Sequence, residues 1–216
     1  HYNLPMVSFR DALFPEIEAG NIKWQDIEAD SVHPNDLGHR YSAEFVTALI
    51  QTVLDKMPKE PKIKSIPDLP EPITSNPFEY TTMLCTKTSV PANNQGWSTD
   101  NDKGPYRQFL GNGWLSEKPG STLEFDIKGS FISIVYHIDK QTDFGMIQVQ
   151  VDNLEPMKLN AYAGWIWNGG MCVWKPIATN LTNGWHKVKI TLLDEKDKDC
   201  QGNKFRFLAV MAAGKK

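Results

Sequence analysis

The sequence lacks the features that would place the protein in a membrane or on nucleic acid. No run of about 18 apolar residues occurs, so no segment is predicted to span a bilayer. The net charge is −3, and no Lys/Arg stripe occurs beyond the pair Lys215–Lys216, so we expect no nucleic-acid partner. Neither a start Met nor a signal peptide is visible, since residue 1 is His1 and the first dozen residues contain no charged segment followed by an apolar core. We therefore expect that an upstream segment has been removed.

Residues that could bind a metal are also scarce. The three cysteines, Cys85, Cys172 and Cys200, are too widely spaced for a Cys-x-x-Cys metal site. They allow at most one disulfide with one thiol left over, and we expect buried or incidental thiols. His39 with a nearby aspartate does not match a known two-histidine spacing. The segment Asp100–Gly104 is not followed by the Glu that a calcium loop requires, since Leu110 stands there, so it reads as a solvated turn. We expect no metal and no cofactor.

The chain does contain enough apolar residues to fold, at 40% hydrophobic and 23% charged. Its clearest boundary is a proline-rich stretch that interrupts helices and central strands and favours an extended connector. Its prolines are Pro58, Pro61, Pro67, Pro70, Pro72 and Pro77. The pattern divides the chain into residues 1–57, a linker over 58–77 and a second part over 78–216.

The first part has a β-then-α pattern. Leu4–Phe9 is predicted to form a short buried strand, and Arg10–Ala19 a helix that Gly20 ends. A second helix is predicted from Asn35 or Asp36 to about Met57. Its apolar face comprises Leu37, Tyr41, Phe45, Leu49 and Val53. One strand and two helices bury too little surface to stand alone, so we expect this part to complete the edge of a larger α/β sheet that begins before His1.

The second part changes to the period of β-strands. The segments 123–127, 131–138, 146–151 and 188–192 are short, apolar or alternating. Turn residues separate them at 118–120, 152–153 and 182–184. This spacing is typical of sandwiches and jelly rolls. We predict an all-β jelly roll or sandwich of eight or nine antiparallel strands in two packed sheets.

Asp30 and His33 lie on the connection between the two predicted helices. The spacing Asp-x-x-His lets one turn bring the carboxylate beneath the imidazole, where it accepts from Nδ1–H and leaves Nε2 free as a base. Pro34 disfavours a helical conformation at His33, which keeps the imidazole just outside the following helix. Taken alone, the pair could equally be a surface hydrogen bond.

The longer motif favours catalysis. Asp30–His39 reads Asp-Ser-Val-His-Pro-Asn-Asp-Leu-Gly-His, and it is preceded by Tyr2–Val7 and followed by a long amphipathic helix. This pattern resembles the final sequence block of the SGNH hydrolases, also called GDSL esterases. Ile22–Asp26 also fits bacterial carbohydrate esterases of that type. The resemblance covers roughly residues 1–57.

The resemblance implies the C-terminal piece of a flavodoxin-like α/β/α fold with a Ser-His-Asp triad, in which Asp30 and His33 come last. The family's nucleophile Ser, in a Gly-Asp-Ser motif, and its oxyanion-hole Gly and Asn are not recognisable here. Ser8, Ser31 and Ser42 lie in the wrong contexts. We therefore expect the serine upstream of this chain, and the 216-residue chain alone to be inactive, because losing a triad member typically costs on the order of 10⁴- to 10⁶-fold in kcat.

Tryptophan is concentrated in the second part, which contains six of the seven. Indole faces stack on the apolar faces of sugar rings, and Trp165 and Trp167 would share one side of a strand, although the glycines around them favour a loop. We regard this pair as a candidate substrate-binding platform. Packing in the core is the competing interpretation of these side chains.

The leading hypothesis is a serine esterase that removes acetyl groups from a polysaccharide, with His33 as general base and acid and Asp30 orienting it. Acylated carbohydrate or another small ester is the expected substrate, which implies a secreted or periplasmic location. Its other expected partner is the missing N-terminal part of its own catalytic domain. The alternatives are a non-catalytic carbohydrate-binding sandwich with an inactive α/β remnant, and a purely architectural sandwich with every Trp buried.

Overall fold

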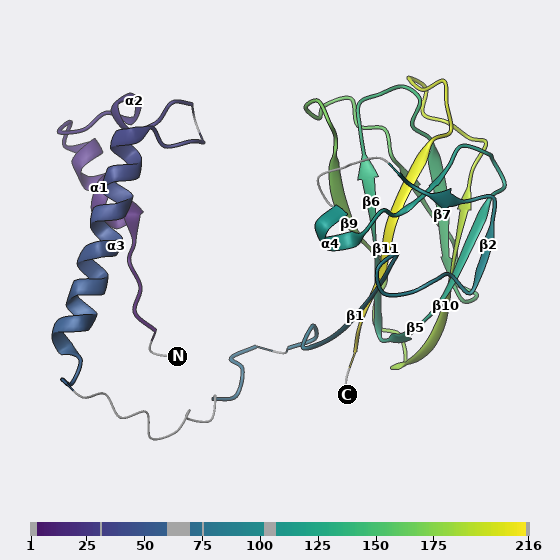
Figure 1. The fold of residues 1–216 in the computed structure, drawn as a ribbon, viewed down its shortest axis with the longest axis horizontal. Helices are drawn as coiled ribbons and strands as arrows, with labels where there is room; N and C mark the ends of the chain where they lie inside the picture. Colours follow the sequence, from purple (N-terminus) through teal and green to yellow (C-terminus); the bar gives the residue numbers. More distant parts are fainter. Residues whose placement is uncertain (1–3, 31, 60–69, 75, 102–106, 215–216) are drawn as a thin grey trace. The chain divides into compact units, whose positions relative to one another are not determined.

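The computed structural model describes residues 4–30, 32–59, 70–74, 76–101 and 107–214 (Figure 1). The chain forms two compact units, His1–Thr74 and Ser75–Lys216. Several predicted features lie wholly or partly outside the described residues. These are residues 2–3 and Ser31 of the longer motif, most of the proline-rich linker, residues 102–104 of the solvated turn, and the pair Lys215–Lys216.

The first unit is built from helices α1 (Phe9–Glu18), α2 (Trp24–Ile27) and α3 (Asp36–Lys56). The Ser8 hydroxyl caps α1 by accepting from the backbone N–H of Asp11 at 3.2 Å. The long helix begins and ends within one residue of its predicted bounds, because Asn35 caps its first turn. Both predicted helices are thus confirmed, whereas the single turn α2 was not predicted.

The predicted strand over Leu4–Phe9 is wrong. Residues 4–8 have no regular structure, α1 starts at Phe9, and Leu4 and Met6 are 77% and 85% exposed. A strand persists only when its backbone is hydrogen-bonded to a neighbouring strand, and the described residues of this unit contain no other strand.

Little of the first unit is buried. Phe45 of α3 lies against Phe9 of α1, with ring centroids 5.9 Å apart. Among the large apolar side chains that the structure describes in this unit, only Ile27 is fully buried. The exposed apolar residues of α3 and its C-terminus are Val46, Ile50, Val53, Leu54 and Met57. The described residues of this unit therefore bury too little apolar surface to form a core.

The second unit is a β-sandwich of two antiparallel sheets (Figure 1). The six-stranded sheet has the order β3-β4-β11-β6-β9, with β1 also paired to β11. Its strands are β1 (Tyr80–Cys85), β3 (Ser98–Thr99), β4 (Trp114–Ser116), β6 (Phe131–Ile138), β9 (Met171–Ala178) and β11 (Phe205–Gly214). The five-stranded sheet has the order β2-β5-β10-β7-β8. Its strands are β2 (Asn93–Gln95), β5 (Thr122–Gly129), β7 (Met146–Val151), β8 (Met157–Asn160) and β10 (Gly184–Leu192).

The sandwich prediction is confirmed, but the described residues form eleven strands rather than eight or nine. The short strands β2, β3 and β4 contain two or three residues each, which is too short to show a period of two. A single turn of helix, α4 (Arg107–Leu110), precedes β4.

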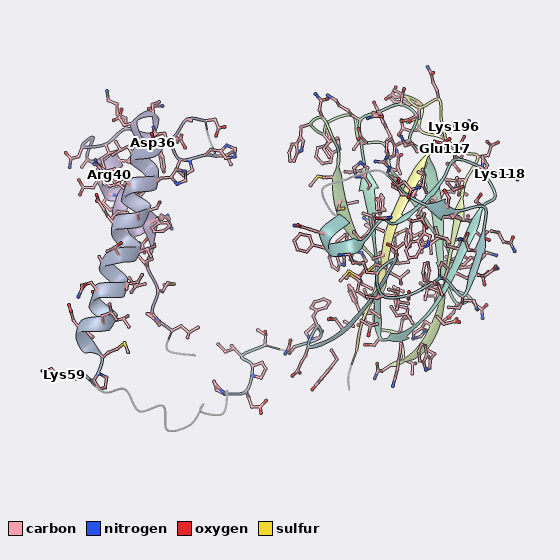
Figure 2. All side chains as sticks on the ribbon, viewed as in Figure 1. Asp36, Arg40, Lys59, Glu117, Lys118 and Lys196 are labelled. Atoms are coloured by element: carbon pink, nitrogen blue, oxygen red, sulfur yellow. The ribbon has the colours of Figure 1, made fainter. Side chains whose placement is uncertain are left out.

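Alternating side chains of both sheets meet in one core, and the sticks in Figure 2 fill the space between the sheets. At its centre the ring of Phe125 lies 5.2 Å from Trp114 and 5.9 Å from Phe207. This packing gives the sandwich a rigid frame, on which its end loops are held.

His186 fastens three segments at one end of this frame. Its Nδ1 lies 2.6 Å from a carboxylate oxygen of Asp152, and its Nε2 lies 2.9 Å and 3.1 Å from the carbonyls of Thr182 and Gly129. Because all three partners only accept hydrogen bonds, both ring nitrogens donate. Burial opposes the charged form, but Asp152 and the two carbonyls outweigh it, so the pKa of His186 is raised.

A raised pKa makes the sandwich less stable in alkali. The contribution of His186 is fully present below the ordinary His pKa of about 6.5 and is lost as pH rises through the folded-state pKa. We expect the free energy of unfolding, measured with urea and tryptophan fluorescence, to fall as the pH is raised above about 6.5. In His186→Gln this fall should be smaller. Equal slopes in the two proteins would show that His186 is not held as a cation.

Candidate functional site

The loop between α2 and α3 carries Asp30 and His33 as a hydrogen-bonded pair. Nδ1 of His33 lies 2.9 Å and 3.0 Å from the two carboxylate oxygens of Asp30. The same carboxylate accepts from the backbone N–H groups of His33 and Val32 at 2.7 Å and 2.9 Å. Donation from the His33 side chain, and then from the two backbone groups, lowers the pKa of Asp30 to about 2. Asp30 is therefore ionised at neutral pH.

The other nitrogen of the imidazole is open. Nε2 of His33 makes no hydrogen bond to any residue that the structure describes, and the side chain is 73% exposed. With Nδ1 protonated toward the carboxylate, Nε2 holds the lone pair. The pair can therefore take a proton from a hydroxyl brought to Nε2, while Asp30 stabilises the resulting imidazolium.

Asn35 and Gly38 fix the base of this loop. The Asn35 side chain donates to the carbonyl of Asp26 at 3.0 Å and accepts from the N–H groups of Leu37 and Gly38 at 3.0 Å and 3.1 Å. Gly38 is buried, and a Cβ there would clash with the carbonyl of Ile27. The Pro-Asn-Asp-x-Gly pattern thus joins the end of α2 to the start of α3.

The two described serines singled out in the sequence are occupied elsewhere. Ser8 caps α1, and the Ser42 hydroxyl donates to the carbonyl of Gly38 at 3.1 Å. The three cysteines are free thiols, and burial raises the pKa of Cys172 to about 12, which makes it a poor nucleophile.

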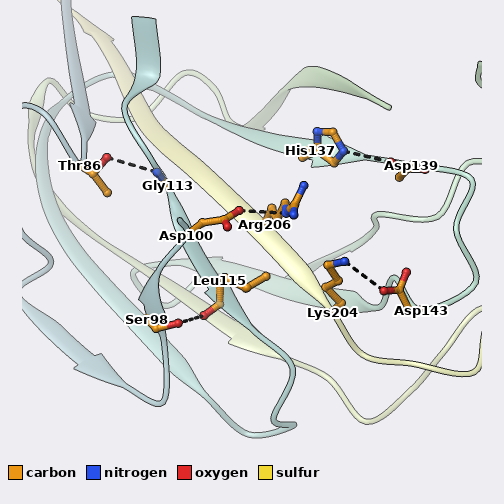
Figure 3. A network of polar contacts seen from close by, with 10 residues as sticks. All are labelled: Thr86, Ser98, Asp100, Gly113, Leu115, His137, Asp139, Asp143, Lys204 and Arg206. Carbon is orange, nitrogen blue, oxygen red and sulfur yellow. Dashed lines mark hydrogen bonds and ion pairs between the residues drawn. The ribbon is translucent and has the colours of Figure 1, made fainter. Parts of the chain in front are cut away.

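His39 is exposed in the first turn of α3, next to Arg40 (Figure 2). One expectation about another polar residue is wrong. Asp100 is not solvated, because it is buried and its carboxylate lies 2.9 Å from Nε of Arg206 (Figure 3). Among the described residues, no three His, Cys, Asp or Glu side chains are grouped to hold a metal ion, and no helix is long and apolar enough to cross a membrane.

Tryptophans of the sandwich fall into two groups. Trp97 and Trp114 belong to the core, at 6% and 4% exposure. Four others are at least half exposed, which excludes the purely architectural interpretation. They are Trp165, Trp167, Trp174 and Trp185.

Trp165 and Trp167 lie on a loop between β8 and β9, not on a strand. Ile166 between them is buried in the core, which turns both indoles outward. The loop is tied down at its start, where Asp139 exchanges backbone hydrogen bonds with Ala161 and Ala163 at 2.9 Å and 2.8 Å. It presents two exposed indoles, 77% and 67% accessible, on an anchored backbone.

The loop also ends beside a buried His–Asp pair. Gly170 has a positive φ of 63° and lies so close to His137 and the Ile138 carbonyl that a Cβ would clash with both. His137 in turn faces Asp139, with Nε2 and Oδ2 3.4 Å apart and both side chains 6% exposed (Figure 3). Burial lowers the pKa of His137.

Two solved structures align with the whole of this chain. One is a two-domain esterase (CEX) active on acetylated mannans, at 27% identity and a TM-score of 0.82. The other is a two-domain esterase (CEX) active on acetylated mannans that was co-crystallized with mannopentaose, at 27% identity and a TM-score of 0.79. This chain covers 57% and 56% of their lengths. No family model and no curated protein matches the sequence.

The structure gives Asn35 a measurable role at the base of the loop. Asn35→Ala should speed hydrogen exchange at the amides of Leu37 and Gly38 by about fivefold, since losing an N-cap costs roughly 1 kcal/mol. Asn21→Ala, which removes only an exposed hydrogen bond to Glu16, is the matched control and should leave both rates unchanged. Unchanged exchange in Asn35→Ala would contradict this role.

Proposed function

We propose that this chain is the C-terminal portion of an SGNH/GDSL-type serine esterase that deacetylates a polysaccharide. The observation that carries the proposal is the Asp30–His33 pair, with Nδ1 bonded to the carboxylate and Nε2 open. The pair stands in a chain that is 27% identical, over its whole length, to an esterase active on acetylated mannans. His33 is the general base and acid, and Asp30 orients it.

The chemistry follows the usual order of acyl transfer. Nε2 of His33 accepts the proton of a serine hydroxyl as its oxygen attacks the ester carbonyl, and then gives that proton to the departing sugar oxygen, which leaves as a hydroxyl. Water, deprotonated by the same nitrogen, then releases acetate from the acyl-enzyme. Throughout, ionised Asp30 compensates the positive charge on the imidazole.

The nucleophile comes from a segment that precedes His1. Two observations support this part of the proposal. The chain spans only 57% of the aligned esterase, and its first unit leaves the apolar face of α3 without a core. The preceding segment would supply the central sheet of a flavodoxin-like α/β/α domain, with the serine and the oxyanion-hole donors, and would cover that face.

Carbohydrate is the proposed substrate class. Trp165 and Trp167 offer two exposed faces on an anchored loop, and an indole face suits the apolar side of a pyranose ring. The aligned esterase acts on acetylated mannans, so an acetylated hemicellulose is the first substrate to test. Hemicellulose is a polymer that lies outside cells, which supports a secreted or periplasmic location.

The triad assignment is tested by ester hydrolysis. The chain extended by its native upstream sequence should hydrolyse 4-nitrophenyl acetate, and the 216-residue chain should not. In the extended protein, His33→Ala and Asp30→Asn should each lower kcat by about 10⁴-fold. His39→Ala removes an exposed imidazole six residues away and should leave kcat unchanged.

Two outcomes would contradict the proposal. If His33→Ala retained the activity of the extended protein, His33 would not be the base. Turnover by the 216-residue chain that depends on His33 would place the nucleophile inside these residues. An extended protein that bound mannan without hydrolysing any ester would instead be a carbohydrate-binding module.

The tryptophan loop should affect polymer more than small substrates. In the extended protein, Trp165→Ala with Trp167→Ala should raise KM for acetylated mannan about 30-fold, because exposed aromatic contacts of this kind each contribute roughly 1 kcal/mol. The kinetics with 4-nitrophenyl acetate should not change. Trp185→Ala, an equally exposed indole on β10, is the control. Equal losses on both substrates would show that the loop supports the active site rather than binding sugar.

A further inference from the structure

The opposite end of the sandwich contains a groove that the proposed chemistry does not use. It is hollowed where β1 and β6 begin and where β9 and β11 end, and its volume is about 680 Å³. Tyr80, Phe131 and Leu181 contribute apolar surface. The polar side chains that line it are Asn76, Glu79, Ser130, Thr179, Asn180 and Asn183. A mixture of aromatic surface and convergent polar groups is typical of small-molecule sites of this size.

Most of these polar groups are available to a ligand. The side chains of Asn76, Glu79, Ser130, Thr179 and Asn180 make no hydrogen bond to any residue that the structure describes. Amides, hydroxyls and one carboxylate offer both donors and acceptors, as a polyhydroxyl ligand requires. Among the described residues, no Lys or Arg side chain lines this hollow, which favours a neutral ligand over phosphate or an acidic sugar.

The groove continues beyond one sugar ring. A second hollow of about 450 Å³ shares Glu79, Tyr80, Asn183 and Gly214 with the first and extends along β1 to Thr82 and Lys128. An elongated depression with a shared aromatic ring at its middle fits a chain of linked sugars better than a compact ligand.

The aromatic floor is held in place before any ligand arrives. Phe131 stacks on Trp174, with centroids 6.0 Å apart and planes 15° from parallel. The indole N–H of Trp174 donates to the hydroxyl of Ser133 at 2.8 Å, which fixes its ring. On the other side Phe78 meets Phe131 edge to face at 5.2 Å. Rigid rings bind with a smaller loss of side-chain entropy.

The polar rim is fixed as well. The backbone N–H of Leu181 donates to the carbonyl of Ser130 at 2.9 Å, which closes the β9–β10 loop onto the β5–β6 turn. Asn180 holds a positive φ of 60°, a conformation that Asn tolerates better than most residues. His186 anchors the same loop through the carbonyl of Thr182.

This groove is separate from the tryptophan loop. The loop with Trp165 and Trp167 precedes β9, whereas Thr179 and Asn180 follow it. The eight residues of β9 span roughly 26 Å, so the two places lie at opposite ends of the sandwich. A short oligosaccharide in the groove would therefore leave the tryptophan loop unoccupied, whereas a long chain could reach both.

We propose that the groove is a second glycan-binding site, which takes an unbranched stretch of neutral oligosaccharide. The neutral ligand class follows from the first hollow, whose described lining residues include no Lys or Arg. The further statement that the ligand is the polymer being deacetylated rests on the proposed function. The groove holds the polymer at a point distant from the tryptophan loop, so that the two sites bind one long chain together and raise the local substrate concentration.

Calorimetry of the 216-residue chain with mannopentaose and cellopentaose tests the site. The measurement is made in the Trp165→Ala/Trp167→Ala background, so that the groove alone contributes. Binding of at least one pentasaccharide should remain, and Asn180→Gly or Tyr80→Ala should weaken it about five- to tenfold, because each removes a contact of roughly 1 kcal/mol. Asn180→Gly keeps the positive φ, so it deletes the side chain without straining the backbone.

Phe109→Ala is the control, because Phe109 is an exposed ring on α4 that lines neither hollow. Its affinity should match that of the background protein. Unchanged affinity in both groove variants, or no binding of either pentasaccharide in the double-Trp background, would overturn the inference. Neither result touches the esterase proposal, which is decided by hydrolysis of 4-nitrophenyl acetate in the extended protein.

Discussion

The carboxylate of Asp30 accepts hydrogen bonds from Nδ1–H of His33 and from two backbone N–H groups of the same short loop. The orientation of the His33 imidazole depends on these bonds. These donors keep Asp30 ionised and fix the tautomer of the imidazole, which leaves Nε2 as the basic nitrogen. The loop holds this geometry because Asn35 joins both flanking helices through three hydrogen bonds. A local network on the surface therefore provides an acid–base pair without a buried site around it.

The sandwich, by contrast, is stabilised by a buried apolar core between its two sheets. Its candidate binding surfaces lie at the two ends. At one end Ile166 anchors a loop that exposes Trp165 and Trp167. At the other end a groove with Phe131 in its floor lies beneath the β9–β10 loop. A rigid frame that separates the two proposed sugar-binding surfaces suits a long polymer, because simultaneous contacts reinforce each other only when the ligand spans both.

Sequence alone predicted the elements whose signals are local. The cap Asn35 and the four-residue apolar spacing located the long helix α3, and Gly20 marked the end of α1. Short apolar or alternating segments located β5, β6, β7 and β10, but not the long strands β9 and β11. The strand at Leu4–Phe9 was mispredicted because strand formation needs a pairing partner that the local pattern cannot reveal.

The sites show the same division. Asp30 and His33 are three residues apart, so their hydrogen bond could be anticipated from spacing. The groove could not, because it is assembled from four segments that meet only in the folded sandwich. The turn signal at 182–184 gave no reason to suspect a binding surface beside it.

If the Asp30–His33 pair is poised as a general base, the imidazole of His33 must be protonated on Nδ1 and bare on Nε2. ¹⁵N–¹H NMR of the imidazoles in the 216-residue chain at pH 8 tests this directly. We expect the His33 signal, identified because it disappears in His33→Ala, to show a proton on Nδ1 and none on Nε2. Asp30→Ala should remove this preference. A proton on Nε2, or a tautomer that is indifferent to Asp30, would contradict it.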